Sequence, residues 1–357
     1  MLKRVFKNLL ALGVGLFFAL VLVEIILHFY NPFSRRVKGN EIVLPAKQVY
    51  SFSNVNIRGL DKEIKHSKNS IGFRGPELPS SPLTKRIFCV GGSTTECFYM
   101  NDGDDWPAVF SKELKGKITE EKFWVNNSGL DGHSTRGHIA LLRDHISKLK
   151  PDYIIFLVGC NDLAAGDFNY MEQNNLVKNM RFLQKFELFN LYLQIKLSRE
   201  AAKRGLGHQE VDLKKWPVAD TLNWQSAAAS RQVIDGYKFR LQALAQLAKM
   251  AGAKPVFITQ PCLFANATDS VSGRYLGNFL YREQSGLHHL QRLEMLNQTL
   301  RTFCQNGGYL CIDAAKQLPA CAANYYDFFH YTKAGSAAMG RIVANGFATF
   351  LTQRVAQ

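Results

Sequence analysis

The feature that most constrains the fold is a regular alternation, from Arg86 onward, of short apolar runs with longer amphipathic stretches. Short, almost continuously apolar runs are typical of strands buried on both faces of a parallel sheet. The alternation therefore predicts one doubly wound α/β domain with five parallel strands. The predicted strands are Ile87–Val90, Phe123–Asn126, Tyr153–Val158, Pro255–Thr259 and Tyr309–Ile312. The predicted helices are Trp106–Leu114, Thr135–Leu149, Arg231–Ala251, Leu287–Cys304 and Thr332–Leu351.

A second constraint lies near the N-terminus, where Leu9–Phe29 is an uninterrupted apolar run apart from Glu24. About 20 such residues, at ~1.5 Å per residue, cross the hydrocarbon core of a membrane as a helix. A cleaved signal peptide usually has a shorter apolar core followed by a small-residue cleavage site. Here Tyr30-Asn31-Pro32-Phe33 follows instead. We expect residues 1–30 to be an uncleaved membrane anchor rather than a signal peptide or a buried core helix.

Basic residues flank this run on both sides, and the α-amine gives the N-terminal side a slight excess of positive charge. The positive-inside rule then favours a cytoplasmic N-terminus and a periplasmic or extracellular C-terminal domain. The formal net charge of the chain is +15. Because its Lys and Arg residues are scattered and no nucleic-acid motif accompanies them, we expect a basic surface near an anionic membrane or polysaccharide and no nucleic-acid partner.

The chain divides into three predicted parts. After the anchor, residues 31–84 are predicted to form a linker and cover segment, since several prolines interrupt regular structure there. The α/β domain occupies residues 85–357 and includes a helical insertion at about 168–225, which is longer than one crossover needs. Two interpretations of the insertion stay open: a lid or wall beside a site, and a surface insertion that only packs.

Polar and glycine-rich clusters follow the predicted strands at one end of the sheet. In open parallel sheets, ligands bind outside the carboxyl ends of the strands. A site is therefore predicted where these clusters meet. The clusters are Gly91–Thr95, Asn127–Gly129, Gly159–Asp162 and, after the last strand, Asp327–His330.

Each cluster has a chemical interpretation. Two glycines before Ser93 permit a tight turn that exposes its hydroxyl. His330 can accept the Ser93 proton, and Asp327 can hold the other ring nitrogen of His330. The Gly129 N–H and the Asn161 amide can donate to a developing oxyanion. Singly these are ordinary features, such as a turn or a helix cap, so the interpretation depends on their combination and order.

The four clusters resemble blocks I, II, III and V of the SGNH (GDSL-type) hydrolases, with Ser93, Gly129, Asn161 and His330 as the four naming residues. The most specific matches are Gly-x-Asn-Asp at 159–162 and Asp-x-x-His at 327–330. The sequence from Tyr331 to Gly335 is similar to the start of the family's last helix. The resemblance covers about residues 86–350 apart from the insertion. It departs at Gly92, where the signature has Asp, which places the chain outside the plain GDSL subgroup.

The resemblance implies a flavodoxin-like three-layer α/β/α sandwich without a metal or organic cofactor. It implies that Ser93 forms an acyl-serine intermediate while His330 accepts the proton and Asp327 fixes the tautomer of His330 and stabilises its imidazolium form. The oxyanion would be held by the N–H groups of Ser93 and Gly129 and by the Asn161 amide. We expect an esterase acting on O-acyl, foremost O-acetyl, groups of an envelope polysaccharide. The open alternatives are an O-acyltransferase, a lipase acting on the membrane and a catalytically silent polysaccharide-binding protein.

Asn69–Gly75, with the sequence Asn-Ser-Ile-Gly-Phe-Arg-Gly, is similar to a segment that precedes block I in many membrane-anchored bacterial members of the family. Arg74 can meet an anionic group over the site. The favoured interpretation is a structural turn with Phe73 in the core.

Seven cysteines leave at least one unpaired within the chain. Two of Cys304, Cys311 and Cys321 can pair if the domain is exported. No C-x-x-C or matching His spacing is present, so a cysteine metal site is not expected.

Overall fold

The computed structural model describes residues 2–30, 37–38, 41–54, 57–165, 182–203, 208, 210–219 and 231–355. The chain forms two compact units, one of residues 1–45 with 169–207 and one of 46–168 with 208–357. These units divide the chain at other places than the predicted boundaries, 30/31 and 84/85, which stay predictions. Of the predicted insertion, residues 168–181, 204–207, 209 and 220–225 lie outside the described residues.

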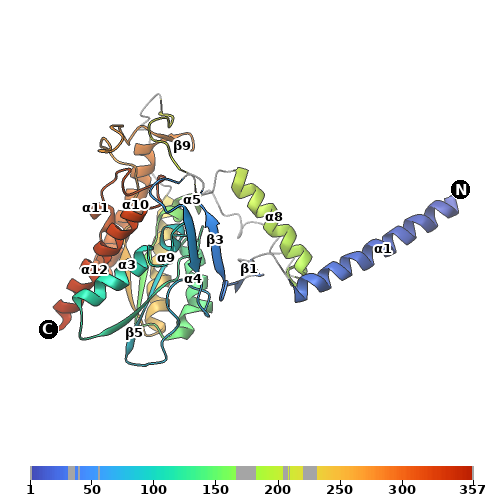
Figure 1. The fold of residues 1–357 in the computed structure, drawn as a ribbon, viewed down its shortest axis with the longest axis horizontal. Helices are drawn as coiled ribbons and strands as arrows, with labels where there is room; N and C mark the ends of the chain where they lie inside the picture. The colour runs from blue at the N-terminus through green and yellow to red at the C-terminus, as the bar shows by residue number, and fades with distance from the viewer. Residues whose placement is uncertain are drawn as a thin grey trace. The chain divides into compact units, whose positions relative to one another are not determined.

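The second unit contains a five-stranded parallel sheet in the order β11-β8-β7-β5-β6. Figure 1 labels β5 of this sheet and the long helices of the same unit. Each of the five predicted runs forms one strand of the sheet, so the predicted fold class is confirmed. Every residue of the central strand β7 is buried, which explains its continuous apolar run. The strands are β5 (Thr84–Gly91), β6 (Lys122–Asn127), β7 (Tyr153–Leu157), β8 (Lys254–Ile258) and β11 (Leu310–Ile312).

Helices cover both faces of this sheet. Tyr153 of β7 packs against Phe347 of α12, whereas Phe156 stacks on Phe257, which packs against Phe303 of α10. Residues an odd number apart in a strand point to opposite faces, so α12 and α10 lie on opposite sides of the sheet. Helix α3 packs with α12, and α4 and α10 pack with α9. The long helices are α3 (Trp106–Lys117), α4 (Thr135–Asp144), α9 (Arg231–Met250), α10 (Gly286–Gly307) and α12 (Lys333–Val355).

Capping residues determine where two of these helices begin and end. The Asp105 side chain accepts a hydrogen bond from the Ala108 N–H at the start of α3, and Ser285 accepts from the His288 N–H at the start of α10. Such side chains satisfy N–H groups that have no partner within the helix. Gly308 ends α10 in the left-handed conformation, with φ 64°.

The predicted helix Thr135–Leu149 is wrong in extent. Helix α4 ends at Asp144, and Ile146–Leu149 form a 3₁₀ turn, η1. His145 between them has a non-helical backbone, with φ −125° and ψ −66°. Ile146 remains fully buried in this tighter turn. The apolar spacing of the helix therefore continues past His145, and the sequence shows no break there.

Shorter elements complete the second unit. Helices α2 and α5 directly follow strands β5 and β7, and a small hairpin, β3–β4, precedes the sheet within residues 46–75. These elements are α2 (Ser93–Glu96), α5 (Cys160–Ala165), α11 (Ala314–Gln317), β3 (Val49–Ser53), β4 (Glu63–Ser67), β9 (Leu280–Tyr281) and β10 (Gln284–Ser285).

The first unit contains the apolar N-terminal helix α1 (Leu2–Phe29) together with β1 (Val37–Lys38), β2 (Glu41–Ile42), η2 (Leu183–Lys185) and α8 (Glu187–Lys203). Residues Lys3–Phe29 have the length and composition to cross a membrane, as an anchor or a signal sequence. Both oxygens of the Glu24 carboxylate accept hydrogen bonds at the start of α8, from the N–H groups of Glu187 at 2.7 Å and Leu188 at 2.9 Å. A negative charge at a helix N-terminus is favourable. The negative charge of Glu24 in the apolar helix α1 is therefore paired with the N-terminus of α8, in the same unit.

All seven cysteines are free thiols in this structure. Cys304 and Cys311 lie close enough to share a hydrogen bond, which lowers the pKa of the Cys311 thiol. The pairing suggested among Cys304, Cys311 and Cys321 stays a prediction.

Candidate active site

The turn after β5 places Ser93 at the carboxyl edge of the sheet, as the first residue of α2. Positions 91 and 92 require glycine because neighbouring atoms lie too close to leave room for a side chain. A Cβ on Gly91 would lie 2.1 Å from Thr95 Oγ1 and 2.8 Å from Leu157 O, and a Cβ on Gly92 would lie 2.5 Å from Asn161 Nδ2. The glycines therefore let α2 and the Asn161 amide come close to the turn that carries Ser93.

Ser93, His330 and Asp327 form one hydrogen-bonded line. Ser93 Oγ lies 2.7 Å from His330 Nε2, and His330 Nδ1 lies 2.6 Å from Asp327 Oδ2. The other oxygen of Asp327 accepts from the N–H groups of Phe329 at 2.8 Å and His330 at 2.7 Å. These bonds orient the carboxylate, and the carboxylate in turn orients the imidazole. The structure thus brings together Ser93, His330 and Asp327, the three residues predicted as nucleophile, base and orienting carboxylate.

The charges of this pair support each other. Burial by itself raises the pKa of the Asp327 carboxyl, but the charge of His330 and the hydrogen bonds from His330 and Phe329 outweigh it, so this pKa lies below its usual value. Burial by itself lowers the pKa of His330, but the charge and hydrogen bond of Asp327 outweigh it, so this pKa is raised. An ionised Asp327 holds a proton on Nδ1 of the neutral ring, which leaves the Nε2 lone pair facing the Ser93 hydroxyl.

Asn161 and Gly129 occupy different positions around Ser93. Asn161 Nδ2 donates one hydrogen bond to the His133 carbonyl at 2.9 Å. A carboxamide carries two N–H groups, and within the residues that the structure describes the second one has no partner, so it can serve a ligand. The single N–H of Gly129 donates to Asn127 Oδ1 at 3.0 Å. Gly129 packs closely on α2, since a Cβ there would lie 2.2 Å from Glu96 N. As an oxyanion donor, Gly129 stays a prediction that requires the Asn127 side chain to move.

Two aromatic residues that the sequence analysis did not single out contact His330. The ring centroids of His208 and His330 lie 4.0 Å apart. The Tyr326 ring stacks on His330 with centroids 5.7 Å apart. His208 Nδ1 also lies 2.6 Å from the Tyr326 hydroxyl, and Nε2 lies 3.6 Å from Asp131 Oδ1. Burial and the neighbouring His330 lower the pKa of His208, so the neutral ring is favoured. Tyr326 directly precedes Asp327 and could have been noticed; His208, in a polar stretch without periodicity, carried no local signal.

A small cavity opens beside the Ser93 hydroxyl. Its volume is about 10 Å³, roughly the minimum that one water molecule requires. The space beside Ser93 is therefore small. Its walls are Ser93, Thr94, Cys97, Tyr99, Met100, Tyr326, His330 and Tyr331.

Within the described part of the chain, one group of side chains has the spacing of metal ligands. Ligand atoms of His208, Asp327 and His330 lie within 4.8 Å of one another. However, Asp327 Oδ2 and His330 Nδ1 are only 2.6 Å apart, whereas two ligands of a tetrahedral zinc ion are about 3.3 Å apart by ordinary bond lengths. The Asp327 Oδ2 and His330 Nδ1 atoms therefore share a proton in this structure.

Comparison with known proteins gives one family. A model of the GDSL-like lipase/acylhydrolase family matches residues 89–338, well over half of the chain. No curated protein matches the chain. Similar solved structures include an acetylxylan esterase from Geobacillus stearothermophilus, with 14% identity, a TM-score of 0.42 and coverage of 74% of this chain and 93% of that chain. A GDSL-like lipase from Bacteroides thetaiotaomicron has 12% identity and a TM-score of 0.41, with coverage of 77% and 93%. These values are too low to support an inference about substrate.

Proposed function

The chain belongs to the GDSL-like lipase/acylhydrolase family, and on this premise we propose that it is a serine esterase that removes small O-acyl groups, foremost O-acetyl, from a polysaccharide of the cell envelope. That it hydrolyses esters follows from the family. The nucleophile, the acyl group, the polysaccharide and the cellular location belong to the proposal. The observation that carries it is the hydrogen-bonded line from Ser93 through His330 to Asp327.

In the proposed mechanism, Ser93 Oγ attacks the ester carbonyl as its proton passes to His330 Nε2. Asp327 stabilises the resulting imidazolium, and the Ser93 N–H and the free N–H of Asn161 donate to the oxyanion. The tetrahedral species then collapses. The C–O bond to the alcohol breaks, the leaving oxygen takes the proton from His330, and Ser93 stays acylated. Water, deprotonated by the same imidazole, attacks the acyl-serine and releases the acid.

The dimensions of the cavity support a small acyl group. A cavity of about 10 Å³ beside Ser93 is roughly the minimum that one water molecule requires. A short acyl group such as acetyl therefore needs less rearrangement of the cavity walls than a longer one.

Two features support a substrate at the cell envelope. The apolar helix α1 can hold the enzyme at a membrane as a single-pass anchor, and the formal net charge of +15 favours an anionic surface. We propose that the unit with the sheet is exported. A reporter fused after Gln357 should then be active only as a periplasmic or extracellular marker, and a cytoplasmic signal would reject this location and the polysaccharide with it.

The experiment that tests the activity uses the full-length chain in detergent, with aryl esters of two to eight acyl carbons and an O-acetylated polysaccharide. Wild type should favour acetate esters and react with a fluorophosphonate at Ser93. Ser93→Ala should lose labelling and nearly all hydrolysis while remaining folded, and Ser111→Ala, on α3, should retain both. If Ser93→Ala keeps activity within about tenfold of wild type, a difference of ~1.4 kcal/mol, Ser93 is not the nucleophile.

A further inference from the structure

The wall of the acyl cavity is a loop that follows α2. Tyr99 and Met100 of this loop line the cavity beside Ser93. The loop begins at Cys97, a non-glycine residue in the left-handed conformation, with φ 49°. Such a backbone persists where surrounding contacts hold it in place. The residues that hold this loop are therefore candidates for setting the size of the cavity.

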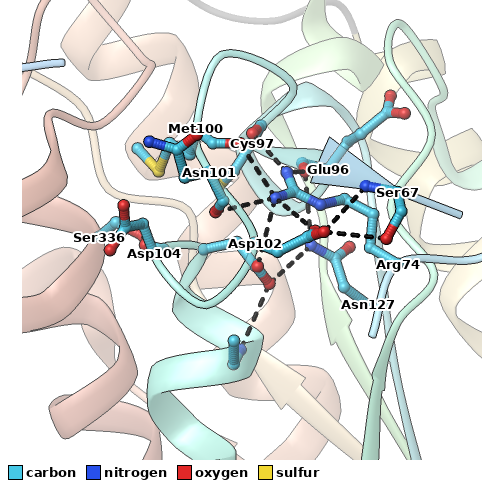
Figure 2. A network of polar contacts seen from close by, with 12 residues as sticks. Ser67, Arg74, Glu96, Cys97, Met100, Asn101, Asp102, Asp104, Asn127 and Ser336 are labelled. Atoms are coloured by element: carbon cyan, nitrogen blue, oxygen red, sulfur yellow. Dashed lines mark hydrogen bonds and ion pairs between the residues drawn. The ribbon is translucent and has the colours of Figure 1, made fainter. Parts of the chain in front are cut away.

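Arg74 binds both ends of this loop, as Figure 2 shows. Its Nη1 donates to the carbonyls of Glu96 at 2.9 Å and Cys97 at 2.7 Å. Its Nη2 donates to the carbonyls of Met100 and Asn101, both at 3.1 Å. The side chain is 1% exposed. One planar guanidinium thus fixes the distance between the start of the loop, at Glu96 and Cys97, and its end, at Met100 and Asn101.

Charged partners hold the guanidinium and the loop in place. Nη2 of Arg74 lies 3.5 Å from Asp102 Oδ1 and 3.6 Å from Asp105 Oδ2. Lys68, a second buried cation six residues before Arg74, has its Nζ atom 2.8 Å from Glu96 Oε1. Because buried charges are tolerated only when they are paired, these groups favour a single arrangement.

The hairpin β3–β4 holds the middle of the loop from the other side. The Phe98 ring stacks on Phe52 of β3 with centroids 5.5 Å apart and meets the His66 ring of β4 edge-on at 4.7 Å. Tyr99 meets the Phe52 ring edge-on at 5.4 Å as well, and it also lines the cavity. The hairpin therefore contacts two adjacent residues of the loop, one of which forms part of the cavity wall.

From these contacts we propose that Arg74 is a specificity-determining, positioning residue: through the loop of residues 96–101 it keeps the cavity small and so limits the acyl group that Ser93 accepts. This rests on the proposed esterase function. The same contacts favour the structural interpretation of Asn69–Gly75, in which Phe73 is fully buried, over contact between Arg74 and an anionic ligand. Lysine cannot replace Arg74 in this role, because an ammonium group has three donors on one atom and cannot span two pairs of carbonyls.

The test measures kcat/KM of the full-length protein for aryl acetate, butyrate and hexanoate. Arg74→Lys should reduce the acetate-to-hexanoate ratio at least about fivefold relative to wild type. The matched control is Arg86→Lys, since Arg86 also donates to backbone carbonyls, those of Leu149 and Pro79, but at the opposite end of β5. It should leave the ratio unchanged. A role in folding alone would lower the active fraction and reduce all three rates equally.

Each outcome decides the inference. A folded Arg74→Lys with a wild-type ratio overturns it while the proposed function stands. Should Arg74→Lys fail to fold, Asp102→Asn decides in its place, because Asp102 is half exposed and pairs with Arg74. This variant should shift the ratio in the same direction by a smaller factor, and an unchanged ratio rejects the inference. A wild type without ester hydrolysis at any chain length rejects the proposed function and the inference together.

Discussion

Gly92→Ala is the substitution whose effect follows most directly from the geometry of the site. A Cβ at position 92 would lie 2.5 Å from Asn161 Nδ2 and 3.0 Å from the His133 carbonyl oxygen. Ordinary contacts between such atoms begin near 3.5 Å. The Asn161 amide therefore has to move by about 1 Å, and it loses its hydrogen bond to His133 as it does so.

This movement should reduce the rate of catalysis far more than the stability of the fold. A catalytic group displaced by ~1 Å costs on the order of 10² in rate, and the loss of one oxyanion donor costs about 10²–10³. We expect kcat to fall about 10²-fold, which is ~2.7 kcal/mol, with KM little changed. The fold should lose only about 1 kcal/mol, near the lower limit for overpacking, since the nearest atom is the end of a flexible side chain.

The assay is steady-state hydrolysis of an aryl acetate together with thermal unfolding. Gly116→Ala serves as the matched control. It lies in α3 with nothing within 4 Å of the added Cβ, so activity should stay at the wild-type level. In a double-mutant cycle, Gly92→Ala should add nothing to Asn161→Ala, because both remove the same donor. A kcat for Gly92→Ala within threefold of wild type, or additive losses in the double variant, would refute the reasoning.

Three further predictions follow from the structure. If His330 is the base, as proposed, activity needs its neutral ring, whose pKa is raised above the ordinary value of 6.5, so kcat/KM should rise with pH through a midpoint above about 6.5. Asp327→Asn should lower that midpoint and reduce kcat by about 10⁴. Asn161→Ala should reduce kcat by about 10²–10³ by a factor independent of pH, since the amide does not titrate, and pH–rate profiles distinguish the two variants. Glu24→Ala removes the acceptor for the first two N–H groups of α8, so hydrogen exchange there should accelerate about fivefold, the equivalent of ~1 kcal/mol; an unchanged rate would mean that the contact contributes nothing.

Local patterns were enough to predict the strands of the sheet and the polar clusters that meet at its edge. The five strand runs and the order of the polar clusters are properties of consecutive residues, and the rule that ligands bind at carboxyl ends brings the clusters to one edge. Asp327 and His330 were predictable as a pair for the same reason, since three residues of spacing and one turn determine their contact. The break of α4 at His145 was missed, because Ile146 keeps helical spacing in a 3₁₀ turn.

The remaining features depend on contacts between segments far apart in the chain. His208 meets His330 across 122 positions (330 minus 208), the carbonyls that Arg74 binds lie 22–27 residues beyond it, and Asn161 determines why position 92 is glycine. By itself the sequence determined the strands of the sheet, most of the helices beside it and the polar clusters at the strand ends, because hydrophobic periodicity and turn residues act locally. Only the tertiary structure decided the size of the cavity, the partner of Arg74 and the engagement of the Gly129 N–H, because these depend on distances of a few ångströms between elements whose separation no local pattern encodes.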